Sequence, residues 1–234
     1  MFLLLALRSF IFYLGFYSSL LIYACLCLLI GPWLSIPKRY PFFLQWNHFI
    51  FLWLRLTCRI RVEILGQENI PSFPVVIVSN HQSPWETIFL YSFFTPVSAI
   101  LKKELLSLPF FGWSLALLQP IAIDRSRKFK ARNDLIQQGR DRFSKGISVL
   151  VFPEGTRVAP GVEKPYQSGA ATLALETGAK ILPVAHNAGY FWPSGKFLKH
   201  PGTIQVRIGP LIETDGKDAR SLTREAEIWI KSAL

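Results

Sequence analysis

The sequence predicts an α/β protein with a partly parallel sheet flanked by helices, preceded by N-terminal membrane-associated helices. Two observations carry this prediction. Strand-like apolar runs alternate with helical stretches from about residue 61 onward, which is typical of a largely buried, partly parallel sheet. The preceding quarter is apolar and contains no Asp or Glu. We therefore expect membrane helices over residues 1–60 and one α/β domain over residues 61–234.

The expected strands are short apolar runs at 61–65, 74–79, 97–101, 121–124, 148–152, 181–185 and 203–208. The expected helices of the domain lie at 84–94, 104–118, 127–145, 167–178 and 218–233. In sheets of this kind, ligands bind beyond the carboxyl ends of the strands. Polar residues that directly follow a strand are therefore the first candidates for a functional site.

The N-terminal segment from Ser9 to Ile30 contains no charged residue over the length that a bilayer core requires. A cleaved signal peptide is the competing interpretation. The apolar run, at about 22 residues, is longer than a signal peptide's apolar region, and no Ala-x-Ala site precedes Gly31. The pattern favours a retained membrane helix.

A second apolar stretch, 41–60, follows a break at Gly31 and Pro32. Its polar side chains share one helical face, which predicts an interfacial or re-entrant helix; they are Gln45, His48, Arg55 and Arg59. We expect His48 to be a solvent-facing member of that stripe.

The composition narrows the class of protein. The chain has 234 residues, half of them hydrophobic, and a net charge of +11. Because the N-terminal basic residues belong to apolar segments, they indicate an anionic membrane surface and argue against nucleic acid. The cysteines Cys25, Cys27 and Cys58 lack zinc-site spacing. We expect them to be buried as small apolar side chains, which is compatible with a reducing cytoplasm.

The stretch "SNHQSPWET", residues 79–87, follows the apolar run 74–78. Ser83, Pro84 and Glu86 form a helix start in which Ser83 is the N-cap and Glu86 completes a capping box. That structural interpretation explains Glu86 without any chemistry. It leaves Asn80 and His81 unexplained. Both lie at the end of an expected strand, a position at which His81 could act as a general base.

Three basic clusters also follow expected strands. Lys102 ends one run and Arg125 follows another, and each is explained by a solvated surface when considered alone. In "FPEGTR", a Pro and Gly turn fixes Glu154 and Arg157 three residues apart. A local ion pair explains that spacing, but an Arg after a Gly turn also suits a phosphate. The sequence contains no glycine-rich phosphate loop and no metal-binding motif.

Five stretches occur together in order: "NHQSPWE", "KKELLSLPFFGW", "IDR", "FPEGTR" and "LPVAHNAG". At these separations they resemble the four-block pattern of the glycerolipid acyltransferase superfamily, most closely its bacterial 1-acyl-sn-glycerol-3-phosphate (lysophosphatidic acid) acyltransferase branch. The resemblance covers about residues 60 to 210, and the N-terminal helix pair also fits it.

The resemblance implies a role for each matched position. His81 corresponds to the general base and Glu86 to its orienting carboxylate, where the family usually has Asp. The implied substrate-binding residues are Lys102, Arg125 and Arg157 for a phosphate, and Glu154 and Gly155 in the acceptor-binding turn. No metal or other cofactor is implied.

The implied activity is transfer of a fatty acyl group from acyl-coenzyme A or acyl carrier protein to the sn-2 hydroxyl of lysophosphatidic acid. The expected location is a bacterial inner membrane, with the catalytic domain on the cytoplasmic face. Three alternatives stay open: another lysolipid or glycerol 3-phosphate as acceptor, a thioesterase or lysophospholipase that uses His81, and a non-enzymatic adaptor that binds anionic lipid.

Overall fold

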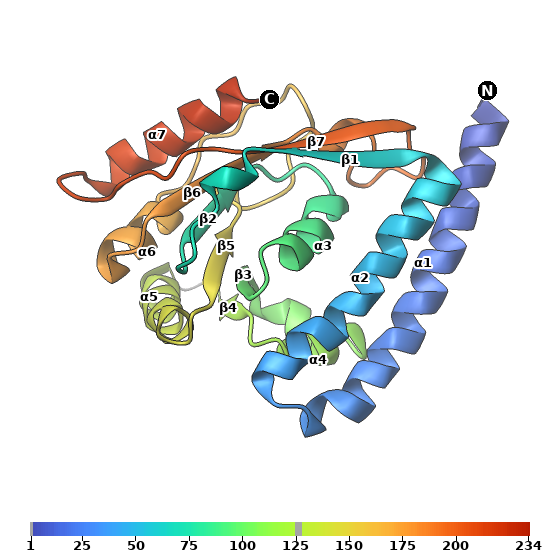
Figure 1. The fold of residues 1–234 in the computed structure, drawn as a ribbon, viewed down its shortest axis with the longest axis horizontal. Helices are drawn as coiled ribbons and strands as arrows, with labels where there is room; N and C mark the ends of the chain where they lie inside the picture. The colour runs from blue at the N-terminus through green and yellow to red at the C-terminus, as the bar shows by residue number, and fades with distance from the viewer. Residues whose placement is uncertain (1, 125–127) are drawn as a thin grey trace.

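The computed structural model describes residues 2–124 and 128–234. Its sheet has seven strands in the order β1-β7-β6-β2-β5-β3-β4 (Figure 1). All neighbouring strands are parallel except β6 and β7, which are antiparallel, so the predicted partly parallel sheet is confirmed. The strands are β1 (Ile60–Leu65), β2 (Val76–Ser79), β3 (Val97–Lys102), β4 (Ile121–Ile123), β5 (Ser148–Val151), β6 (Ile181–His186) and β7 (Gly202–Ile208).

Helices cover both faces of the sheet (Figure 1). They are α1 (Phe2–Ile30), α2 (Ile36–Cys58), α3 (Pro84–Phe93), α4 (Phe111–Ala116), α5 (Lys128–Ser144), α6 (Gly169–Thr177) and α7 (Ala219–Ser232). Alternate residues of β2 point to opposite layers: Ile77 packs in the core beneath α1, α2 and α3, whereas Val76 and Val78 pack beneath α5, α6 and α7. Two apolar layers therefore hold the carboxyl ends of the central strands in fixed positions.

The single helix expected over 104–118 is wrong. The segment forms a 3₁₀ turn, η3 (Lys103–Ser107), followed by the short helix α4. Leu108 between them has an extended backbone, because the residue before a proline is disfavoured in the helical region and Pro109 follows it. The interruption places a tight, apolar bend beside the end of β3.

The helices α1 and α2 form an antiparallel pair alongside the α/β domain (Figure 1). Near the start of α1, the Phe12 ring packs edge-on against Trp192 at 4.9 Å between centroids. Lys199 is 1% exposed, and its Nζ lies 2.5 Å from the Tyr13 hydroxyl. The far end of α1 packs against α4. The domain thus contacts α1 in its first half and at its far end.

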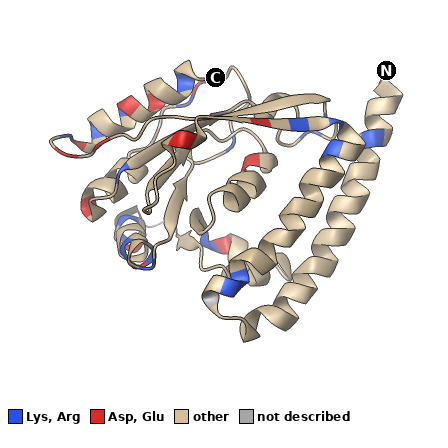
Figure 2. Ribbon diagram, viewed as in Figure 1, with Lys and Arg blue, Asp and Glu red and all other residues tan. Residues whose placement is uncertain are grey.

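The outer surface of this pair is apolar. By length and composition, the segment Phe2–Trp33 could cross a membrane; an 18-residue window within it has a mean hydropathy of 2.0. Figure 2 shows that most of both helices is uncharged, with Lys and Arg near the two ends of the pair. On α2, Gln45, His48 and Arg55 are exposed as the stripe pattern predicted. Arg59 lies just beyond the helix in a left-handed conformation.

Candidate functional site

The end of β2 and the start of α3 bring His81 and Glu86 together. His81 Nδ1 lies 2.8 Å from Glu86 Oε1. The predicted capping box is present, because Ser83 Oγ accepts a hydrogen bond from the Trp85 N–H and Glu86 reaches back to the Ser83 N–H. The two interpretations of "SNHQSPWET" are therefore compatible: one carboxylate both caps the helix and orients an imidazole.

The Glu86 carboxylate is held by several donors in a fully buried position. Its Oε1 also accepts hydrogen bonds from the backbone N–H groups of Gln82 and Ser83, at 2.9 and 2.8 Å. Burial raises the pKa of Glu86, but the imidazoles of His186 and His81 and the backbone donors outweigh it and bring the pKa below its ordinary value. An ionised carboxylate only accepts, so His81 Nδ1 carries the proton and Nε2 carries the lone pair.

The loop after β5 holds His81 from the other side. The Phe152 ring stacks on the imidazole at 4.2 Å between centroids, and the Val158 N–H donates to the His81 carbonyl at 2.7 Å. The Glu154 Oε1 accepts from the His81 N–H at 3.2 Å. Ring, carbonyl and amide of His81 are all fixed, which pre-organises Nε2 for proton transfer.

Glu154 is a buried carboxyl with an unusual proton affinity. Burial raises its pKa to about 7, and the nearby charge of Glu86 acts in the same direction against the hydrogen bond from His81. Within the described residues, its Oε2 has no hydrogen-bond partner and Arg157 makes no ion pair with it. The local ion pair considered from the sequence is therefore absent, and Arg157 is exposed.

A further residue of the site, His186, was missed by the sequence reasoning. Asn80 Nδ2 donates to the His186 carbonyl at 2.8 Å, and Asn80 Oδ1 accepts from the His186 N–H at 3.0 Å. The His186 Nε2 lies 2.8 Å from the Asn80 carbonyl and 3.9 Å from Glu86 Oε2. Burial lowers the pKa of His186, and the charge of the neighbouring Glu86 carboxylate acts in the opposite direction.

The signal for His186 was the polar tail of "LPVAHNAG" at a strand end. The strand pattern alone does not show that β6 pairs with β2, and only that pairing sets His186 against Asn80.

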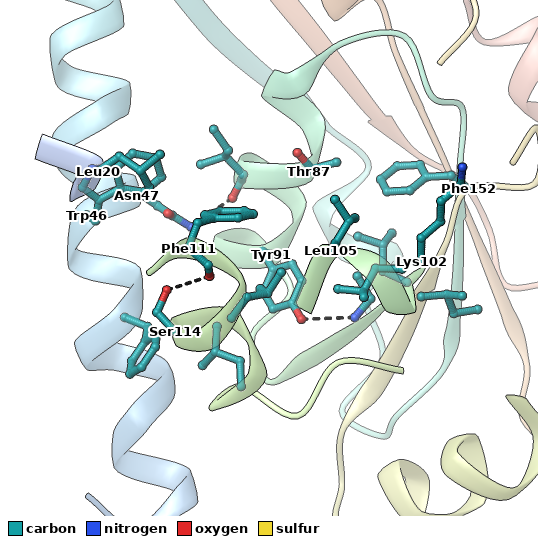
Figure 3. Close-up of a pocket in the computed structure, with 18 of the residues that line it drawn as sticks. Leu20, Trp46, Asn47, Thr87, Tyr91, Lys102, Leu105, Phe111, Ser114 and Phe152 are labelled. Carbon is teal, nitrogen blue, oxygen red and sulfur yellow. Dashed lines mark hydrogen bonds between the residues drawn. The ribbon is translucent and has the colours of Figure 1, made fainter. Parts of the chain in front are cut away.

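The His81 side chain lines a cavity of about 620 Å³. One wall comes from the sheet's carboxyl edge and includes Phe152 and Lys102; the opposite wall comes from α1 and α2 and includes Leu20 and Trp46 (Figure 3). Between them lie apolar side chains of α3, η3 and α4. The cavity thus joins one basic, polar end to a long apolar interior.

The remaining predicted residues fall into two groups. Lys102, Gly155 and Arg157 line the same cavity as His81. Gly155 has φ +71°, and a Cβ there would also lie 3.1 Å from Gln167 Nε2, so the turn requires glycine. Arg125 lies outside the described residues. Among the described residues, no three His, Cys, Asp or Glu side chains converge in a way that would hold a metal ion.

Comparison with known proteins identifies the class. Residues 61–187, which contain the catalytic candidates His81 and Glu86, match the acyltransferase family. The solved structure of the 1-acyl-sn-glycerophosphate (LPA) acyltransferase PlsC of Thermotoga maritima has the same fold, with a TM-score of 0.80 over 97% of this chain and 93% of that one, at 24% identity. The chain belongs to the acyltransferase family.

Two relatives show which members of the family the chain is similar to. A 1-acyl-sn-glycerol-3-phosphate acyltransferase of Pseudomonas aeruginosa is 46% identical over 98% of this chain and 91% of its own length. One from Chlamydomonas reinhardtii is 32% identical over 74% of this chain and 53% of its own length. The chain therefore spans about half of the algal relative and nearly all of the bacterial one.

Proposed function

We propose that this protein transfers a fatty acyl group from a thioester to the sn-2 hydroxyl of lysophosphatidic acid, which yields phosphatidic acid for phospholipid synthesis. The observation that carries the proposal is the His81–Glu86 pair on the wall of a cavity that is basic at one end and apolar beyond. The names of the relatives, each a 1-acyl-sn-glycerol-3-phosphate acyltransferase, support the same acceptor.

His81 acts as the general base. Its Nε2 takes the proton of the acceptor hydroxyl as that oxygen attacks the thioester carbonyl, and a tetrahedral intermediate forms. The intermediate collapses, the carbon–sulfur bond breaks, and the leaving thiolate takes the proton from the imidazolium. The substrate supplies the nucleophilic oxygen, so no protein nucleophile is needed.

Glu86 stabilises the imidazolium that forms during attack. Its charge is fixed by the backbone donors of Gln82 and Ser83, so it does not have to reorient during the reaction. Glu154 holds the amide of His81 and takes part in the acceptor-binding turn with Gly155. His186 is a positioning residue, since it reaches the reaction only through Asn80 and Glu86.

Lys102 and Arg157 bind the acceptor's phosphate at the basic end of the cavity, with Arg125 as the third cation that the motif predicts. A guanidinium and an ammonium suit a doubly charged phosphate. The donor is acyl-coenzyme A or acyl carrier protein; both are anionic and fit the exposed basic residues near the start of α5, Lys130 and Arg132. The chemistry proposed requires no metal or other cofactor.

The apolar outer surface of α1 and α2 associates with the membrane that holds the acceptor. Because the domain packs against α1 both at Phe12 in its first half and at its far end, we favour a pair that lies in one leaflet over a helix that crosses the bilayer. The catalytic domain then faces the cytoplasm, where the donors are found, at the inner membrane of a bacterium.

The test is phosphatidic acid formation by purified, detergent-solubilised protein given lysophosphatidic acid and an acyl-coenzyme A. We expect His81→Ala to lose about 10²- to 10⁴-fold in rate. His200→Ala, which changes an exposed histidine outside the site, is the matched control. Equal rates for wild type and His81→Ala would refute the mechanism.

A second arm addresses the hydrolase alternative. The same protein is incubated with the donor but without acceptor, and free fatty acid is measured. Without acceptor, a transferase releases little fatty acid, whereas a thioesterase releases fatty acid as fast as it does with acceptor present. Carrier-protein donors and other lysolipid acceptors, assayed in parallel, decide the donor and the acceptor.

A further inference from the structure

A cluster of exposed apolar side chains lies on the bend between β3 and α4. Five residues define this cluster, here named the aromatic tip: Leu105, Leu108, Phe110, Phe111 and Trp113. Each is between 38% and 48% exposed, and the Phe110 and Trp113 rings lie 5.7 Å apart between centroids. Exposing a cluster of apolar side chains to water is unfavourable, so a cluster of this kind indicates an interaction surface.

The backbone of the tip is held in a strained conformation. Phe110 has φ +60° and ψ −63°, which is unfavourable for a bulky residue. The Gly112 N–H donates to the Leu108 carbonyl at 2.9 Å, and a Cβ at Gly112 would lie 2.3 Å from the Leu105 carbonyl oxygen. Strain that a fold maintains in order to present an exposed aromatic side chain indicates a function for that side chain.

The tip is continuous with the cavity. Leu105 and Phe111 are exposed and also line the cavity that contains His81 (Figure 3). Lys102, directly before η3, lines it as well. Exposed side chains of the tip and the catalytic His81 therefore line one and the same cavity.

The tip is also close to the end of the helix pair at which α1 joins α2. Helix α4 packs against α1, and the Arg39 side chain at the start of α2 donates to the Leu117 carbonyl at 3.3 Å. At that end of the pair, Leu29 is 69% and Trp33 is 88% exposed. Lys38, near the start of α2, and Lys103, at the start of η3, are also exposed, and their charges complement anionic headgroups.

We propose that the aromatic tip inserts into a phospholipid leaflet and forms the portal through which the acceptor's acyl chain passes from the leaflet into the cavity. The proposal deepens the proposed function and rests on it for the identity of the acceptor. A lipid leaflet fits better than a protein partner, because Leu105 and Phe111 of the tip also line a largely apolar cavity and α4 packs against α1 of the apolar helix pair.

The first experiment measures binding alone. Full-length protein exchanged out of detergent is mixed with vesicles of phosphatidylethanolamine and phosphatidylglycerol, without substrates, and the partition coefficient is determined by flotation. Phe110→Gly removes the ring and relieves the positive φ, so the fold should be at least as stable as the wild type. Trp113→Ser removes the second ring. We expect each variant to partition about fivefold more weakly.

The matched control is Ile228→Ser on α7, which removes a similarly exposed apolar side chain, 58% exposed, on the other face of the sheet. We expect it to partition as the wild type does. Unchanged partition of both tip variants would overturn the proposal. So would an equal loss in Ile228→Ser, because the effect would then come from general surface hydrophobicity.

The second experiment measures passage. Each protein is assayed with a long-chain lysophosphatidic acid embedded in the vesicles and with a short-chain one that dissolves as monomers. For the tip variants, we expect the KM for the embedded acceptor to rise about tenfold more than the KM for the monomeric one. An equal rise for both acceptors would contradict a portal. A loss confined to carrier-protein donors would make the tip a protein-docking surface and contradict it too.

These arms separate the two proposals. If the wild type makes no product from either acceptor while the tip variants still partition more weakly, insertion of the tip stands and the proposed function fails. If product forms and partition is unaffected, the proposed function stands and the portal fails.

Discussion

The two walls of the cavity are built on different physical principles. On the sheet side, hydrogen bonds hold the reacting groups: His81 is held at its ring, carbonyl and amide, and Glu86 Oε1 accepts from three donors. On the side of α1 and α2, the lining residues are mostly apolar and are held mainly by packing, as with Leu20 (Figure 3).

This difference assigns the chemical reaction to the sheet side of the cavity and the recognition of the acyl chain to the helix side. Directional bonds hold reacting groups to within a fraction of an ångström, which general-base catalysis requires. Apolar packing is tolerant of shape, so it can accept an alkyl chain without fixing one conformation. We therefore expect substitutions on the sheet side to change rates strongly, and substitutions on the helix side to change mainly which chains are accepted.

After His81→Ala, the largest effect is expected for Glu86→Gln. The Gln carbonyl can still accept from the two backbone N–H groups and from His81 Nδ1, so the imidazole keeps its tautomer and loses only the compensating charge. We expect kcat to fall about 10²-fold with little change in Tm. Steady-state kinetics and thermal unfolding check this, with the exposed Glu68→Gln as control. A loss of stability with full activity would leave Glu86 only its capping role.

Arg157→Ala is expected to act on binding. Its guanidinium is exposed at the basic end of the cavity and makes no ion pair with Glu154 within the described residues, so the fold should not need it. We expect the KM for lysophosphatidic acid to rise about tenfold or more and the KM for the acyl donor to change far less. Arg224→Ala on α7 is the control. Equal rises for donor and acceptor would contradict a phosphate-binding role.

Glu154→Gln tests the raised pKa. The folded protein holds the Glu154 proton up to a pKa of about 7, whereas the ordinary value is 4.5. The folded state therefore binds more protons in that window, and the wild type loses stability as the pH rises through it. We expect the fall in unfolding free energy between about pH 4.5 and 7 to shrink by up to roughly 3 kcal/mol in the variant. Denaturant titrations at both pH values measure it, and an unchanged fall would refute the raised pKa.

The strands and the dyad were predictable because their signals are local. Each strand is a short apolar run with polar ends, and the capping box places Glu86 within reach of His81 wherever the helix begins. The roles of the site residues stay predictions, and Arg125 lies outside the described residues. His186 was not predictable, because its contacts with Asn80 join residues 106 positions apart through a strand pairing that no local pattern reveals.

The same distinction explains the bend after β3. Its break at Pro109 is a local signal that the helical periodicity of 104–118 concealed. By contrast, the strain at Phe110 and the contact of α4 with α1 depend on tertiary packing. The apolar wall as a whole is of that second kind: residues of α1 reach the cavity only because the helix pair docks on the domain.

The smallest effect is expected on that wall. Ala24 is buried on α1 and lines the cavity on the side away from Phe152 and Lys102. Ala24→Leu fills part of the apolar interior and leaves the hydrogen bonds of His81 untouched. We expect a shift of about two- to fivefold in kcat/KM toward shorter acyl chains, because one or two methylenes in an apolar pocket discriminate weakly. A series of acyl-coenzyme A donors of increasing length measures it. A uniform loss at every length would show that this wall, too, must be rigid for the reaction itself.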